Sequence, residues 1–140
     1  MAPPDPRAPV AAIREAARRA VAETSLRAVA RAIPMSPMGL QHFINGTRPY
    51  RATLRKLTAW YVNRGASRGE FSRDTARAAL ALLLDGIPEP HQAAARAALL
   101  ERLLRIHRDA RTEPPAWLES LLSGEDDGGA DDDMGDDPDA

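Results

Sequence analysis

Four side chains that can make polar or apolar contacts with a partner recur at helical spacing between residues 38 and 45. They occupy positions i, i+3, i+4 and i+7 and are Met38, Gln41, His42 and Asn45. Gln41 can make a paired donor–acceptor contact to adenine, His42 can donate to guanine or to a phosphate, and Met38 can touch a thymine methyl group. Asn45 can make either contact, or can cap the end of the helix. The spacing predicts that these side chains share one helix face, which has groups that match DNA bases; the alternative is a polar solvated helix face.

Two short helices joined by a tight turn are expected to position these side chains. The first has an apolar stripe at i, i+3, i+4 and i+7, formed by Leu26, Val29, Ala30 and Ile33. Ser25 or Thr24 can cap its start, and Pro34 ends it because the ring removes a donor. The second helix starts at Ser36-Pro37, where a proline in the first turn costs no hydrogen bond. Its inward residues are Leu40, Phe43 and Ile44, and Gly46 ends it.

This segment resembles the lambda-repressor/Cro-like helix-turn-helix family. The matching positions are small, apolar or polar as the family requires, and they are Val29-Ala30, Ile33, Met35, Leu40, Phe43 and Asn45-Gly46. The resemblance extends weakly from Pro9 to Arg64, where a preceding and a following helix would complete the family's small bundle. Pro34 departs from the family, which usually has glycine in the turn. Since proline cannot take a positive φ, the turn is expected to differ locally.

The resemblance implies that the second short helix enters the major groove of double-stranded DNA and that the residues after it approach the backbone. By that carry-over the phosphate contacts are Thr47, Arg48, Tyr50 and Arg51. Ser36 can also bond a phosphate while it caps the helix. For Tyr50 the alternative is a core aromatic side chain. The implied function is sequence-specific DNA binding as a transcriptional regulator, and the alternative is a protein–protein adaptor or antitoxin-like module with the same helical fold.

Charge is distributed very unevenly along the 140 residues, although the net charge is only −1. Residues 1–73 have thirteen Lys or Arg against four Asp or Glu, and residues 124–140 have none against nine. A basic N-terminal part is typical of a nucleic-acid binder, although arginine-rich helices can also serve solubility alone. The acidic end has almost nothing to bury, so we expect it to be disordered and to compete with DNA for the basic part. A purely solubilising tail is the alternative.

The organisation predicted for the chain is all-α. A helix from Pro9 to Glu23, with inward Val10, Ile13, Ala17 and Val21 and outward Arg14, Arg18 and Arg19, precedes the two short helices. A helix over residues 53–63 follows, and together these make a DNA-binding domain over residues 9–64. A glycine-rich linker (65–72), a helical C-terminal unit (73–122) and the disordered acidic tail (123–140) complete the chain. The leucines at 80–84 and the apolar face of 95–106 exceed what one small unit buries, which predicts a homodimer.

Other chemistry is not indicated by the sequence. Cysteine is absent, and His42, His91 and His107 lack metal-ligand spacing. No glycine-rich phosphate loop occurs, and the acidic residues do not follow the spacing of an EF-hand calcium loop. No apolar run reaches the length of about 20 residues that a membrane span needs. We therefore expect no enzymatic activity, cofactor, metal or membrane association, and a soluble protein of the cytoplasm.

Overall fold

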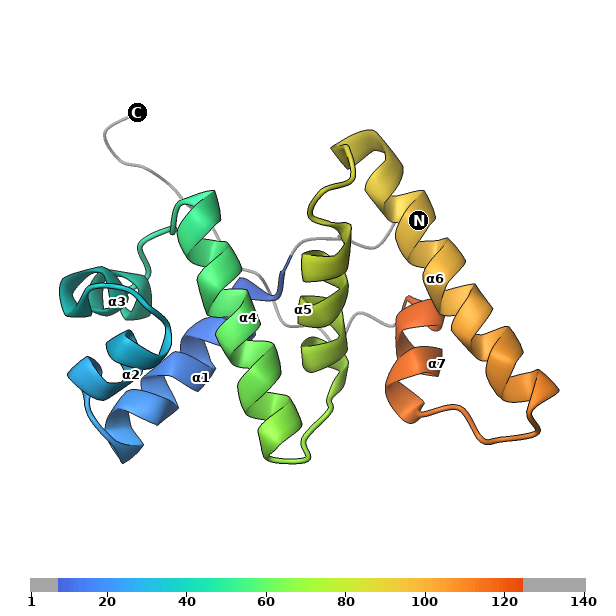
Figure 1. Cartoon of the computed structure of the whole chain (residues 1–140), viewed down its shortest axis with the longest axis horizontal. Helices are drawn as coiled ribbons and strands as arrows, with labels where there is room; N and C mark the ends of the chain where they lie inside the picture. The colour runs from blue at the N-terminus through green and yellow to red at the C-terminus, as the bar shows by residue number, and fades with distance from the viewer. Residues whose placement is uncertain (1–7, 125–140) are drawn as a thin grey trace.

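The computed structural model describes residues 8–124, and these form seven helices and no strand. In chain order the helices are α1 (Val10–Glu23), α2 (Leu26–Ala32), α3 (Pro37–Ile44), α4 (Arg51–Ser67), α5 (Arg73–Leu84), α6 (Glu89–Asp109) and α7 (Ala116–Ser123). Figure 1 shows α1, α2 and α3 on one side of α4, with α5 on its other side and α6 and α7 beyond α5. The predicted all-α class is confirmed.

The first hydrophobic core lies among α1, α2, α3 and α4. Its buried side chains are Ile13, Ala17, Ala20, Val29, Ala30, Ile33, Leu40, Phe43, Ile44 and Leu57. All three residues predicted to face inward from α3 belong to this core. On α1 the buried stripe contains Ala20, whereas Val10 and Val21 pack at its edge and are only partly buried. The core therefore fixes α3 by its apolar side and leaves the opposite side outside.

Local hydrogen bonds begin and end the two short helices as their sequences predict. The Ser25 hydroxyl accepts from the Ala28 N–H at 3.1 Å at the start of α2, and the Ser36 hydroxyl accepts from the Gly39 N–H at 3.0 Å at the start of α3. Gly46 follows α3 with a φ of +108°, which is open to glycine because it has no Cβ. Both serine side chains thus satisfy backbone donors that the helices leave unpaired.

The turn between α2 and α3 differs from the expectation for proline. Pro34 has a φ of +30°, whereas its ring favours about −65°. The expectation that the ring would exclude a positive φ was therefore wrong. Buried Ile33 and Leu40 anchor the two sides of the turn, and the Met35 N–H closes it on the Ala30 carbonyl at 3.0 Å.

The glycine-rich segment after α4 is more helical than predicted. We expected the helix to end near Asn63, but α4 continues to Ser67, and the connection to α5 is only residues 68–72. Gly69, with a φ of +71°, makes the turn, while Gly65 lies inside the helix where α4 meets the start of α5. Because Gly65 has no side chain, α4 can approach the start of α5 this closely. The division of the chain into domains stays a prediction.

Replacing Gly65 by alanine should destabilise the protein. An added Cβ would lie 2.9 Å from the Glu70 carbonyl oxygen and 3.1 Å from the Thr75 hydroxyl. Overpacking of this kind costs about 1–3 kcal/mol, which exceeds the gain of about 1 kcal/mol in helix propensity. Thermal unfolding should show a lower Tm for Gly65→Ala, and no drop for Gly86→Ala, whose Cβ would meet nothing within 4 Å. Equal Tm values for the two variants would contradict the close contact.

The second core lies among α5, α6 and α7. It contains Ala76, Leu80, Leu100, Leu118 and Leu121. The leucine run of α5 is divided, because Leu80 and Leu84 are buried whereas Leu83 is 71% exposed. On α6 the predicted apolar face is also divided: Leu100 is buried, whereas Leu99, Leu103 and Ile106 remain 40–49% exposed. The helix has one apolar side in the core and another apolar stripe outside it.

Ser123 ends α7 and Gly124 follows it with a φ of +66°, so the predicted tail does not include Ser123. The predictions of disorder and of competition with DNA concern residues 125–140, which lie outside the described residues. Between residues 8 and 124, no helix is long and apolar enough to cross a membrane.

Candidate nucleic-acid interface

The outward face of α3 carries all four side chains that the sequence predicted to contact bases. Met38 is 71% exposed, and Gln41, His42 and Asn45 are exposed as well. The Gln41 side-chain amide donates to the Asn45 side-chain oxygen at 3.1 Å. Asn45 also occupies the C-cap position of α3, with its backbone N–H on the Gln41 carbonyl at 3.0 Å. The face therefore has the predicted composition, and two of its amide groups are held together along the helix.

Three of the residues predicted to contact phosphate lie in the short segment between α3 and α4. Thr47 and Arg48 are exposed, and the Thr47 N–H is held by the His42 carbonyl at 2.9 Å. Tyr50 is 88% exposed, so the alternative of a core aromatic side chain was wrong. Ser36 is exposed at the other end of α3, where its hydroxyl proton is available to an acceptor because the oxygen accepts the capping bond. These groups flank the outward face of α3 at both of its ends.

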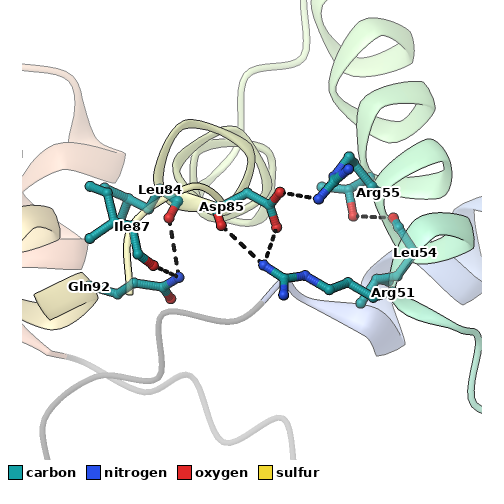
Figure 2. Close-up of polar contacts among 8 residues, drawn as sticks. Arg51, Leu54, Arg55, Leu84, Asp85, Ile87 and Gln92 are labelled. Carbon is teal, nitrogen blue, oxygen red and sulfur yellow. Dashed lines mark hydrogen bonds and ion pairs between the residues drawn. The ribbon is translucent and has the colours of Figure 1, made fainter. Parts of the chain in front are cut away.

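Arg51 is engaged by an acidic residue that the sequence analysis did not consider. Its Nη2 donates to the Asp85 carbonyl oxygen at 3.1 Å and lies 3.4 Å from Asp85 Oδ1, and Arg55 donates to the other carboxylate oxygen, Oδ2 (Figure 2). Partial loss of solvent would raise the pKa of the Asp85 carboxyl, but the hydrogen bonds and charges of Arg55 and Arg51 outweigh it and lower that pKa. Arg51 is thus a phosphate candidate that already has an anionic partner.

Two arginines of α1 hold the C-terminal end of α3, although we expected them to face outward. Arg14 Nε donates to the Phe43 carbonyl at 2.7 Å, and its guanidinium lies 4.9 Å from the centre of the Phe43 ring. Arg18 Nη2 donates to the Ile44 carbonyl at 3.0 Å. Cations at this end of a helix satisfy its free carbonyls and oppose the negative end of its dipole. The sequence signal for this role was the spacing of Arg14 and Arg18, which are four residues apart and lie beside the apolar stripe of α1.

Replacing Arg14 by methionine should loosen α3 while it preserves most of the side-chain volume. The variant loses a hydrogen bond from a charged donor and a cation–π contact, so we expect the free energy of unfolding to fall by about 1–3 kcal/mol. Arg19→Met is the matched control, because the Arg19 side chain is exposed and its ion pair with Glu15, at 3.4 Å, is of the surface kind that contributes little. Chemical denaturation measures both variants. Equal loss in the two would show that Arg14 has no special role at α3.

The surroundings of α3 are strongly cationic. Residues 24–69 contain eight arginines or lysines and no aspartate or glutamate. Four of these cations have carboxylate partners outside that segment: Arg64 and Arg68 contact Glu23 at 2.9 and 3.1 Å, and Arg51 and Arg55 contact Asp85. Hydrogen bonds from Arg68, together with its charge, and the contact with Arg64 lower the pKa of Glu23.

The remaining cations include three that lie on α2 or beside its turn. Lys56 Nζ donates to the Pro34 carbonyl at 3.2 Å, which places a positive charge beside the turn between α2 and α3. Arg27 and Arg31 of α2 are exposed and form no ion pair within the described part of the chain. Positive charge therefore lies on α2 and beside the turn that leads into α3, while α3 itself has no lysine or arginine. An anionic partner of α3 would be attracted by these neighbouring cations.

Comparisons with models of protein families, with curated proteins and with solved structures found no match to this chain. Within residues 8–124, no three His, Asp or Glu side chains gather where they could hold a metal ion. The interface therefore has to be interpreted from its own residues, their exposure and their charge.

Proposed function

We propose that the chain binds double-stranded DNA in a sequence-specific manner, with α2 and α3 acting as a helix-turn-helix, and that it serves as a transcriptional regulator. The observation that carries this proposal is the outward face of α3, whose exposed Met38, Gln41, His42 and Asn45 lie in a segment with eight cations and no carboxylate. An α-helix fits the major groove, and these side chains match the donors, acceptors and methyl groups found there. The resemblance to the lambda-repressor/Cro-like family supports the same role.

The proposed interface divides its residues between base and phosphate contacts. Met38, Gln41, His42 and Asn45 face the base edges, while Ser36, Thr47, Arg48 and Tyr50 at the two ends of α3 bind the backbone. Phosphate contacts set the register of the helix in the groove but carry no sequence information directly. Arg14 and Arg18 do not contact the DNA in this proposal; they position α3 by binding its C-terminal carbonyls to α1.

Salt dependence of binding to random duplex DNA tests the proposal. Each phosphate neutralised by a lysine or arginine contributes about −0.9 to the slope of log affinity against log salt concentration. Contacts from Arg48 and from the neighbouring cations Arg27, Arg31 and Lys56 should therefore give a slope of about −3 to −4. Selection from random duplexes should then enrich one defined site. A flat salt dependence or no binding at low salt would favour the alternative, an adaptor that binds another protein. The exposed apolar stripe of α6 is the feature that favours this alternative.

We further propose that the protein is a homodimer, formed through the outer stripe of α6. Leu99, Leu103 and Ile106 are 40–49% exposed and follow the four-then-three spacing of a seam between two helices. A symmetric pair would present two copies of α3 about 34 Å apart, and would require a palindromic site. Sedimentation at high micromolar concentration should give a dimer, which Leu103→Glu disrupts and Ala98→Glu, on another side of α6, does not. A folded monomer at that concentration would contradict the dimer.

A further inference from the structure

The C-terminal end of α5 is held firmly in place. Asp85 occupies the C-cap position of this helix. The side chain of Gln92, from the start of α6, donates to the Leu84 carbonyl at 3.1 Å and to the Ile87 carbonyl at 2.9 Å (Figure 2). These bonds fix the backbone on both sides of Asp85. The backbone that carries the Asp85 carboxylate is therefore held by hydrogen bonds on both sides.

Two arginines of α4 converge on this carboxylate. Arg51 and Arg55 lie four residues apart in the first turns of α4, so they share one face of the helix. Figure 2 shows both side chains directed at Asp85 from the opposite side to Gln92. Their side chains are nevertheless 74% and 54% exposed. Both guanidinium groups can thus meet another anion without any rearrangement of the backbone.

The contacts of Arg51 and Arg55 with Asp85 connect the N-terminal helices to the C-terminal helices. Arg51 follows directly after the segment of the proposed phosphate contacts, whereas Asp85 belongs to α5 and to the helices that follow. Since residues 24–69 contain no acidic residue of their own, Asp85 introduces a negative charge into a cationic segment. A cation at the N-terminal end of α4 is also unfavourable for the dipole of that helix, so Asp85 offsets a local cost.

We propose that Asp85 competes with DNA phosphate groups for Arg51 and Arg55, so that the C-terminal helices limit the affinity of the interface; this inference rests on the proposed function. With Asp85 in place, the two arginines are partly neutralised and attract the backbone of the duplex weakly. When a duplex binds, phosphate oxygens replace the carboxylate on one or both guanidinium groups. Exposed ion pairs are weak and are screened by salt, so the exchange is reversible and fast.

The test compares Asp85→Asn with Asp109→Asn in the full chain, using a random duplex over a range of salt concentrations. Both substitutions remove one negative charge, but Asp109 at the end of α6 pairs with no described arginine. Asp85→Asn should tighten binding at low salt by about threefold to tenfold, in keeping with the modest strength of exposed ion pairs. It should also steepen the salt slope by about one to two units, since one or two arginines are released to phosphates. Asp109→Asn should leave both quantities close to those of the wild type.

Further variants separate competition from other effects. Asp85→Ser, which keeps an oxygen at the helix end, should behave like Asp85→Asn, and Tm values establish that both are folded. In an Arg51→Ala/Arg55→Ala background, Asp85→Asn should no longer tighten binding. Weaker binding by Asp85→Asn would overturn the proposal, because Asp85 would then be positioning the arginines for phosphate.

Unchanged binding by Asp85→Asn would overturn it too, since the arginines would then lie away from the DNA. If the wild type itself shows no salt-dependent binding, the proposed function fails together with this inference. Failure of the proposed function is thus seen in the wild type alone, whereas failure of the Asp85 inference is seen only when the variants are compared with a wild type that binds.

Discussion

Replacing Phe43 by alanine should lower the free energy of unfolding by about 3–5 kcal/mol, the largest loss that we expect from a single substitution. Phe43 is 2% exposed and lies in the core shared by α1 to α4. Removing its ring leaves a cavity in this core, because the close-packed surroundings relax only partly. The Arg14 guanidinium, 4.9 Å from the ring centre, also loses its aromatic partner. Chemical denaturation followed by circular dichroism measures the loss.

Phe71→Ala is the matched control, because Phe71 is the other phenylalanine of the chain. It is 45% exposed and touches Trp117 edge-on, with ring centres 5.5 Å apart. Its loss should cost about 1 kcal/mol, the usual contribution of an aromatic pair. Comparable losses in the two variants would contradict the assignment of Phe43 to the core. Phe43→Ala should weaken DNA binding only through the unfolded fraction, because its side chain faces away from the outward face of α3.

The short helices of the proposed interface could be predicted from the sequence because their signals are local. The hydroxyls of Ser25 and Ser36 each accept a hydrogen bond from the backbone N–H three residues later, and Gly46 has a positive φ directly after α3. The alternation of buried Leu40 and Phe43 with exposed Met38 and Gln41 needs only the helical period. Each of these features involves residues within one or two turns of each other, which is the range over which sequence spacing determines structure.

Contacts between distant parts of the chain could not be predicted in the same way. Asp85 meets Arg51 from 34 residues away, and Arg14 meets the Phe43 carbonyl from 29 residues away. Their partners depend on how α4 crosses α5 and how α1 crosses α3, which local spacing does not specify. Gly65 shows the same limit: glycine signals a loop when read locally, but here its small size permits the packing of α4 against α5.

Replacing Gln41 by alanine should lower the affinity for the selected DNA site by about 1–3 kcal/mol and relax selectivity at one base pair. Gln41 is the residue of the outward face best suited to a bidentate contact with adenine. To make it, the side-chain amide has to leave Asn45, to which it donates at 3.1 Å. The free energy of unfolding should hardly change, because the lost pair contributes about 0.2–0.5 kcal/mol and alanine favours the helix. Competition binding with single-base variants of the site measures both effects.

Four further variants distinguish sequence-specific contacts with bases from a general electrostatic attraction to DNA. Met38→Ala and His42→Ala should act in the same direction but more weakly, since neither makes as directional a contact. Arg48→Ala should weaken binding to all sequences alike and reduce the salt slope by about one unit. Asn63→Ala, an exposed amide on α4, should change nothing. If folded Gln41→Ala, Met38→Ala and His42→Ala all bind the selected site like the wild type, α3 does not read DNA, and its face is solvated or meets a protein partner.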